Sequence, residues 1–330
     1  MIDKSQEYAY AGIPTFFKSD YGTVTELPGY DIGVFGVPTD TAASNRIGAR
    51  LGPAAIRRAS AFYNPQTYFK KETAIDMYQN QKVIDIDHPS ILDLGDVTVY
   101  PLDLKKTLLS IESFMFDAGK LAFPVILGGD HSVTYPLVKG LVRGLKEKEK
   151  TGNIGIIHFD SHPDIWESYV THEDVWHGSP FRNLLEDGII KGENLVTVGD
   201  RSLLADYEYE YMNRHGVKLY SISDVWERGM TAVMEEAVSY LDAHCDGIYV
   251  SIDIDVMDPA YAPGTGTPAP GGLTPREMIQ AVNIICNSKR LVGIDLVEVA
   301  PDFDPSECTA NLAAFILHRF FILYKGFRKG

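Results

Sequence analysis

Short runs of continuously apolar residues constrain the fold of this chain more than any other feature of its sequence. The clearest runs, rich in β-branched residues, are 31–37, 123–127, 153–159, 195–198, 217–222, 247–254 and 291–299. Apolar character that does not alternate predicts strands buried on both faces, as in a parallel sheet. Segments with helical spacing lie between them, most clearly 110–118, 135–149, 230–244, 275–288 and 310–324. This alternation predicts an α/β fold with a mainly parallel sheet.

Local signals refine this prediction at three places. Thr274, followed by Pro275 at the first helical position, is typical of a helix N-cap. Ser223 and Asp224 are candidates to cap a short helix from residue 225. The Tyr-rich stretch 62–100 lacks regular periodicity and is interpreted as an insertion or a long connection.

Composition and charge limit the possible partners. With 45% hydrophobic and 23% charged residues the composition is globular. No linker or repeat divides residues 1–330, which predicts a single domain. A formal net charge of -15 disfavours nucleic-acid binding and favours cationic ligands. The most apolar late stretch, 312–324, is too short to cross a membrane. Without a secretory signal, and with three cysteines (Cys245, Cys286 and Cys308) expected to be buried free thiols, we predict a cytoplasmic protein.

Polar residues follow four of the apolar runs, where ligands collect in open α/β sheets. The candidates are His131, Asp160, His162, Asp164, Asp253, Asp255 and Glu298. Asp160, His162 and Asp164 occupy every second position, as do Asp253 and Asp255, so in an extended chain the side chains of each set point to one side. Alone, each residue is more simply a cap or a turn residue, and His158 is a candidate core or supporting histidine. The two histidines and four aspartates of this set, without a thiolate, suit hard or borderline ions such as Mn²⁺. These six ligands are more than one ion usually takes from a protein, so they suit two ions.

The same segments resemble the ureohydrolase superfamily of arginases and agmatinases. Its signatures appear as 128–132, 159–164 and 251–259, with further matches at 36–38, 44–53, 263–268 and 271–274. The matches at 44–46 and 263–268 are similar to the agmatinase branch. The resemblance implies a three-layer α/β/α sandwich around an eight-stranded, mainly parallel sheet. It also implies a homo-trimer or homo-hexamer. Residues 11–17 resemble the N-terminal arm of guanidinobutyrase-like members, so residues 1–30 are expected to form an arm that can approach the active site or a neighbouring subunit.

The resemblance also implies residue roles. One Mn²⁺ would be held by His131, Asp160, Asp164 and Asp253, and the other by Asp160, His162, Asp253 and Asp255, with Asp160 and Asp253 bridging. Glu298 would pair with the substrate guanidinium, His177 would deliver a proton to the departing amine, and Asp164 would orient the nucleophile. The expected reaction cleaves a guanidino compound to urea and an amine, most simply agmatine to putrescine and urea.

Departures from the family pattern leave the substrate open. In the loop 165–176, Trp166 and Trp176 are candidates to narrow the pocket or to stack on a guanidinium. Glu173 or Asp174 is a candidate to bind the ammonium of agmatine, although both acids are equally well explained as solvated loop residues. A pocket narrowed by the tryptophans would favour free guanidine, with nickel a conceivable metal. The loop has no Lys or Arg, which disfavours guanidinobutyrate and guanidinopropionate. Asp200 also departs from the commonest family form. A non-catalytic binding subunit and a single-metal deacetylase-like hydrolase are the remaining alternatives.

Overall fold

The fold is built on one nine-stranded sheet. The computed structural model describes residues 8–63, 73–80, 82–85, 89–148, 152–167 and 175–327. The strand order is β1-β5-β2-β6-β11-β10-β7-β8-β9, and every pairing in this sheet is parallel. The strands are β1 (Asp20–Tyr21), β2 (Ile32–Gly36), β5 (Ile91–Asp96), β6 (Phe123–Leu127), β7 (Ile154–Phe159), β8 (Leu195–Val198), β9 (Lys218–Tyr220), β10 (Gly247–Asp253) and β11 (Leu291–Val297). The predicted parallel α/β fold is confirmed, with nine strands where eight were expected.

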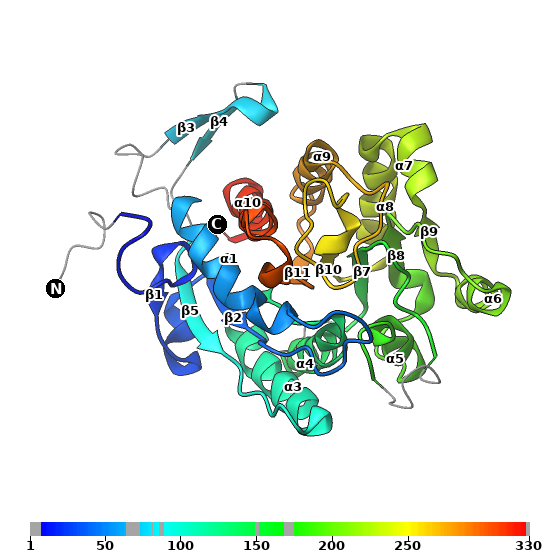
Figure 1. The fold of residues 1–330 in the computed structure, drawn as a ribbon, viewed down its shortest axis with the longest axis horizontal. Coiled ribbons are helices and arrows are strands. Elements are labelled where there is room, and N and C mark those ends of the chain that lie inside the picture. Colours follow the sequence, from blue (N-terminus) through cyan, green and yellow to red (C-terminus); the bar gives the residue numbers. More distant parts are fainter. Residues whose placement is uncertain are drawn as a thin grey trace.

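Helices cover both faces of the sheet and give three layers (Figure 1). One face carries α1 (Gly52–Ser60), α7 (Ile222–Arg228), α8 (Met230–His244), α9 (Pro275–Ile285) and α10 (Cys308–Leu323). The other carries α3 (Leu104–Leu121), α4 (Thr134–Glu147), α5 (Pro180–Glu186) and α6 (Asp206–His215). Each face of the sheet packs on its own hydrophobic core, and successive residues of a strand alternate between the two cores. Ile156 and Ile157 of β7 are an example. Burial on both faces explains why the strands are continuously apolar.

The stretch 62–100, interpreted above as an insertion or a long connection, contributes to the main sheet. It contains β5, which lies between β1 and β2, and a hairpin of β3 (Thr73–Asp76) and β4 (Lys82–Asp85). The apolar pattern of β5 is interrupted by Asp93, which is 1% exposed. The guanidinium of Arg57 in α1 pairs with Asp93 at 2.9 Å, so this strand buries its carboxylate with a cation beside it.

Helix starts partly follow the sequence signals. Thr274 caps α9 as predicted, and its hydroxyl accepts from Glu277 N. The cap of α7 is Ser221, reciprocally bonded with Asp224, so the prediction that Ser223 caps this helix was wrong. Cys308 is the first residue of α10 and is exposed, which corrects the expectation that all three thiols are buried. Among the described residues, no helix combines the length and apolar character needed to cross a membrane.

The described part of the predicted N-terminal arm has two kinds of segment. Phe16 and Phe17 are buried, and both rings pack against Phe321 of α10. Tyr8 and Ile13 project with 66% and 82% of their surface exposed. The arm is therefore anchored in the core from Phe16 onward, and its contact with an active site or a neighbouring subunit stays a prediction.

Candidate active site

The candidate site lies where four neighbouring strands end. β6, β11, β10 and β7 are consecutive in the sheet, so their carboxyl ends meet at one edge. Asp253 is the last residue of β10, Asp160 follows β7, and Glu298 follows β11. His131 begins a 3₁₀ turn, His131–Val133, shortly after β6. The sheet order thus brings together residues that the sequence separates by more than a hundred positions.

His131 faces three carboxylates. Its Nδ1 lies 3.0 Å from Asp160 Oδ2, 2.9 Å from Asp164 Oδ2 and 3.2 Å from Asp253 Oδ2. Within the described residues this buried nitrogen has no partner in hydrogen-bond geometry. Although burial opposes it, these carboxylates raise the pKa of His131 well above its usual value, because a positive charge on the ring offsets theirs. A divalent cation between the groups would supply that positive charge instead.

A second group forms around His162. Its Nδ1 lies 3.3 Å from Asp160 Oδ1 and 3.2 Å from Asp255 Oδ2. Asp160 therefore presents one oxygen to His131 and the other to His162. His158, inside β7, donates its Nε2–H to Asp160 Oδ2 at 2.8 Å. The ligand atoms of His131, His158, Asp160 and Asp164 have the spacing of a site that could hold a metal ion, and so have those of Asp160, His162 and Asp255.

Burial makes the charge of this cluster costly. It raises the pKa of Asp253 well above the usual range, and the negative charges of Asp255 and Asp160 add to the effect. Burial and the charge of Asp160 raise the pKa of Asp164 to about 7. Burial also lowers the pKa of His158 to about 4, so this ring stays neutral. The residues fit divalent cations, which would remove the cost of the carboxylate charges.

A buried polar layer beneath the cluster orients His131. Its Nε2 lies 2.9 Å from Ser251 Oγ, and the Ser251 hydroxyl donates to Asp295 Oδ1 at 2.7 Å. Asp295 also accepts from Thr134 Oγ1 and Tyr249 OH, at 2.9 and 2.8 Å. Because Ser251 gives its hydrogen to Asp295, its oxygen accepts Nε2–H of His131. This fixes the tautomer that leaves the lone pair of Nδ1 facing the carboxylates.

His177 and Glu298 lie beside the cluster. Glu298 Oε1 accepts from the backbone N–H of His131 at 3.0 Å and lies 3.1 Å from His177 Nδ1. Burial by itself lowers the pKa of His177, but the hydrogen bond with Glu298 and the negative charges of Glu298, Asp164 and Asp130 together outweigh burial and raise the pKa to about 9. On its other side, His177 Nε2 lies 2.7 Å from Ser44 Oγ. Ser44 stands in one of the family-like segments, yet sequence analysis gave it no role.

The two tryptophans form a stacked pair next to these groups. The rings of Trp166 and Trp176 are 5.9 Å apart and inclined by 23°. Trp166 lies 5.8 Å from the ring of His162, and Trp176 lies 5.5 Å from that of His177. A Cβ on Gly178 would come within 2.7 Å of both tryptophans, so glycine permits this packing. Glu173 and Asp174, the candidate ammonium ligands, lie outside the described residues.

Two arginines near the strand ends are bound to backbone. Arg46 donates to the carbonyls of Thr265 and Gly266 at 2.7 and 3.2 Å. Arg201 donates to the backbone carbonyl groups of Asp255 and Ala269, each at 2.7 Å. These guanidinium groups hold loops at the site in place and are not free cations.

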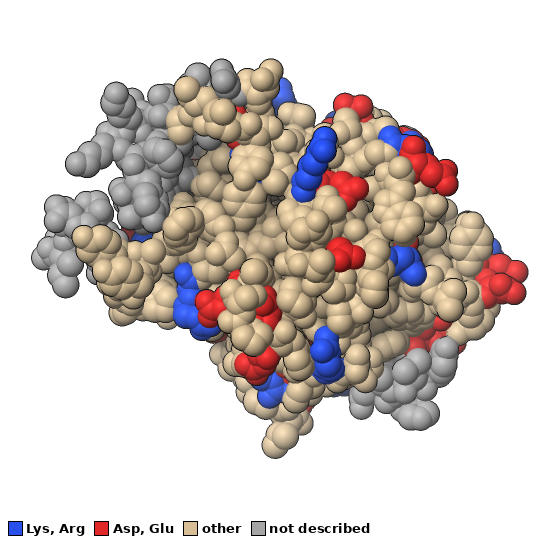
Figure 2. Space-filling model, turned by 45° about the horizontal axis from the view of Figure 1, so that its top comes forward, with Lys and Arg blue, Asp and Glu red and all other residues tan. Residues whose placement is uncertain are grey.

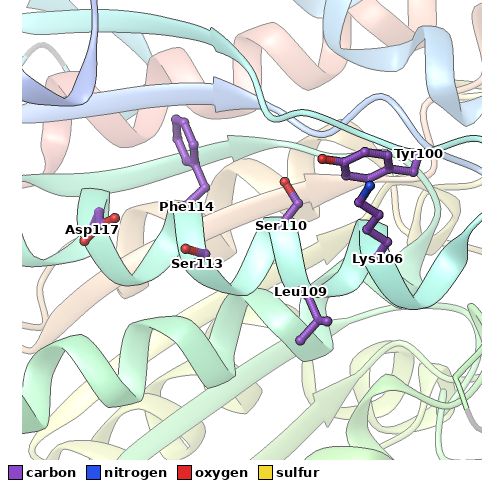
Figure 3. Close-up of a pocket in the computed structure, with 7 residues that line it drawn as sticks. All are labelled: Tyr100, Lys106, Leu109, Ser110, Ser113, Phe114 and Asp117. Atoms are coloured by element: carbon purple, nitrogen blue, oxygen red, sulfur yellow. The ribbon is translucent and has the colours of Figure 1, made fainter.

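A surface hollow lies along α3, apart from these residues (Figure 3). It has a volume of about 420 Å³ and is lined by Tyr100, Lys106, Leu109, Ser110, Ser113, Phe114 and Asp117. The ammonium of Lys106 lies 4.0 Å from the ring centroid of Tyr100. Elsewhere, Figure 2 shows basic and acidic side chains interspersed in small groups over one face. None of the candidate metal ligands lines the α3 hollow.

Comparison with known proteins identifies the family. A model of the arginase family matches residues 30–322. The chain belongs to the arginase family. The mitochondrial agmatinase of Gallus gallus is 36% identical over 92% of this chain and 83% of its own length. The guanidinopropionase of Pseudomonas aeruginosa is 34% identical over 96% of this chain and 93% of its own length.

Solved structures agree with the family assignment. The proclavaminate amidino hydrolase of Streptomyces clavuligerus superimposes with a TM-score of 0.81 at 31% identity, covering 98% of this chain and 100% of its own. This confirms the predicted arginase-like fold. As a member of the arginase family, the chain is a hydrolase that acts on C–N bonds in linear amidines.

Proposed function

We propose that this arginase-family protein is a binuclear metal-dependent amidinohydrolase that cleaves a guanidino compound to urea and an amine. The observation that carries the proposal is the geometry of Asp160. One of its oxygens lies 3.0 Å from His131 Nδ1 and the other 3.3 Å from His162 Nδ1. A single carboxylate shared by two imidazole groups is suited to bridge two cations.

The family resemblance, together with the two groups, suggests which residues would hold the cations. His131, Asp160, Asp164 and Asp253 would hold one ion, and Asp160, His162, Asp253 and Asp255 the other. Nitrogen and carboxylate donors without thiolate favour Mn²⁺. Two bound ions would lower the pKa of water and would thus supply a nucleophile at neutral pH.

Glu298 is suited to bind the substrate cation. Its Oε1 is occupied by His131 N and His177 Nδ1, which leaves Oε2 for a guanidinium. Gly266 leaves space on this side, because a Cβ there would lie 3.5 Å from Oε2. A carboxylate held in this way neutralises the guanidinium and positions its carbon for attack.

His177 is suited to complete the reaction. Attack of hydroxide on the guanidinium carbon gives a tetrahedral intermediate, and its C–N bond breaks only if the departing nitrogen gains a proton. Nδ1 of His177 lies beside Glu298, where that nitrogen would be held. Transfer of the Nδ1 proton to that nitrogen breaks the C–N bond and releases the amine. The hydroxyl proton of the intermediate passes to a base, for which the carboxylate of Asp164 is suited, and neutral urea is left.

Agmatine is the substrate that we propose first. The chain is acidic, with a net charge of -15, and Arg46 and Arg201 are occupied by backbone carbonyl groups. No free arginine is therefore available at these two places to bind the carboxylate tail of a guanidino acid. A second cationic group on the substrate suits this environment better.

Free guanidine is a second candidate, supported by the stacked tryptophans. Trp166 and Trp176 pack against the rings of His162 and His177, where a substrate tail would leave the site. Two large rings at this place would leave less room for a long substrate tail than for free guanidine. Nickel would then replace manganese as the metal to test first.

The test is urea release by the protein loaded with Mn²⁺ and, separately, with Ni²⁺. Agmatine, 4-guanidinobutyrate, 3-guanidinopropionate, arginine and guanidine are run side by side, and bound metal is counted. Turnover of agmatine with two ions per chain is the expected result. Turnover of guanidine alone would select the second candidate. One ion per chain would support a single-metal hydrolase, and no bound metal with no turnover would support a binding subunit and refute the proposal.

A further inference from the structure

Ser44 makes two contacts with one nitrogen of His177. Its backbone N–H donates to Nε2 at 3.1 Å, and its hydroxyl oxygen lies 2.7 Å from the same nitrogen. The opposite ring nitrogen, Nδ1, lies 3.1 Å from Glu298 Oε1. The ring is thus held between an exposed loop residue and the buried carboxylate of the site.

The two contacts suit different protonation states of the ring. A backbone N–H can only donate, so its bond to Nε2 requires a lone pair there and suits the neutral ring with its proton on Nδ1. The protonated ring carries a hydrogen on Nε2, which the backbone N–H cannot accept. The hydroxyl oxygen of Ser44 is the acceptor within reach for that hydrogen.

The loop that carries Ser44 is itself tied to the site. The backbone N–H of Ala42 donates to Asp130 Oδ2 at 3.0 Å, and that of His177 donates to Ala42 O at 3.1 Å. Asp130 is fully buried and precedes His131. These bonds place the Ser44 hydroxyl against the histidine ring.

We propose that Ser44 is a positioning residue for His177, which holds Nε2 in both protonation states and thereby keeps Nδ1 directed at Glu298. The inference rests on the proposed function, in which Nδ1 supplies the proton to the departing amine. The charged groups that act on the ring are Glu298, Asp164 and Asp130, all of which favour its protonated form. Against this background, Ser44 supplies the neutral acceptor that the protonated ring needs.

The test compares Ser44→Ala with Ser44→Thr. Alanine keeps the backbone donor but removes the acceptor, so it destabilises the protonated ring. With the substrate that wild type turns over best, we expect kcat at alkaline pH to fall about ten-fold with little change in KM, because a hydrogen bond to a charged group is lost. The alkaline limb of the kcat profile should move to lower pH. Ser44→Thr should restore the wild-type profile, and Ser113→Ala, on α3, serves as the matched control.

A second readout does not depend on activity. The pKa of His177 is measured by histidine-labelled NMR in protein loaded with diamagnetic Zn²⁺, with His177→Asn identifying the signal. We expect that pKa to fall by about one unit in Ser44→Ala, which corresponds to the ten-fold effect. An unchanged pKa, or a kcat loss that is equal at all pH values and that threonine does not rescue, would overturn the inference. If wild type hydrolyses no guanidino compound while the pKa still falls, the proposed function fails and the Ser44 contact stands.

Discussion

Asp200 gives a prediction whose size follows from its surroundings. The carboxyl is 4% exposed, and its Oδ1 accepts from the backbone N–H and the hydroxyl of Ser202. Within the described residues Oδ2 is buried without a partner. Burial, helped by the negative charge of Asp160, raises the pKa of Asp200 from 3.8 to about 6. This side chain is therefore expected to destabilise the folded protein at neutral pH.

The direction in which Asp200 changes stability with pH follows from proton uptake. The folded state holds the Asp200 proton up to about pH 6, whereas the unfolded chain loses it near 3.8, so stability falls as pH rises through this window. A difference of two units corresponds to a cost of about 3 kcal/mol, complete above pH 7 and about half as large at pH 5. Asp200→Asn keeps an acceptor for Ser202 and removes the charge, so the variant should gain this amount relative to wild type.

The assay is denaturant unfolding of metal-free wild type and Asp200→Asn at pH 8 and pH 5. The advantage of the variant should be larger at pH 8 by about 1.5 kcal/mol. Asp302→Asn, at an exposed position, should show no such difference. Bound cations favour ionised Asp200, so the gain should shrink in metal-loaded protein. An equal effect at both pH values, or a loss that is greater at pH 8, would refute the reasoning.

Three further substitutions probe the candidate site. His131→Ala should abolish urea release and lower the number of bound ions measured by elemental analysis, whereas full activity in a metal-depleted variant would contradict the binuclear site. Asp295→Asn weakens the acceptor of Ser251 and should lower Mn²⁺ affinity about 10- to 100-fold in a metal titration, with the fold intact by circular dichroism. Gly178→Ala should separate the two stacked tryptophans, which changes their fluorescence and lowers kcat/KM; an unchanged spectrum would show that the loop adjusts.

Much of the fold could be predicted because burial on both faces of a parallel sheet leaves a simple pattern. β10 and β11 are apolar along most of their length, and the apolar runs of the sequence predicted both strands. β5 was missed because Asp93 and Asp96 leave it only three apolar side chains, fewer than β11 keeps around its own buried Asp295. The buried carboxylate of Asp93 is paired with Arg57. That pairing joins positions 36 residues apart, and no local pattern indicates it.

The site shows the same division between local pattern and distant contact. The spacing of Asp160, His162 and Asp164 was visible because these residues follow a strand directly. The contact between Ser44 and His177 spans 133 residues and depends on where two loops meet. The support of His131 by Ser251 spans 120 residues and depends on neighbouring strand ends. Such contacts follow from the order of strands in the sheet, which the residue pattern leaves open.

Backbone strain at the site was equally invisible in the sequence. Asp164 and Glu298 have φ angles of 45° and 63°, in the left-handed region that favours glycine. Conformations of this kind cost about 1–3 kcal/mol each and persist only where the surroundings enforce them. Glu298 N is held by Gly129 O at 2.8 Å, and Asp164 O accepts from Phe181 N at 3.2 Å. Glycine would relieve the strain at either position but remove the carboxylate, so the strained backbone is best understood as the cost of placing these two carboxylates at the strand ends.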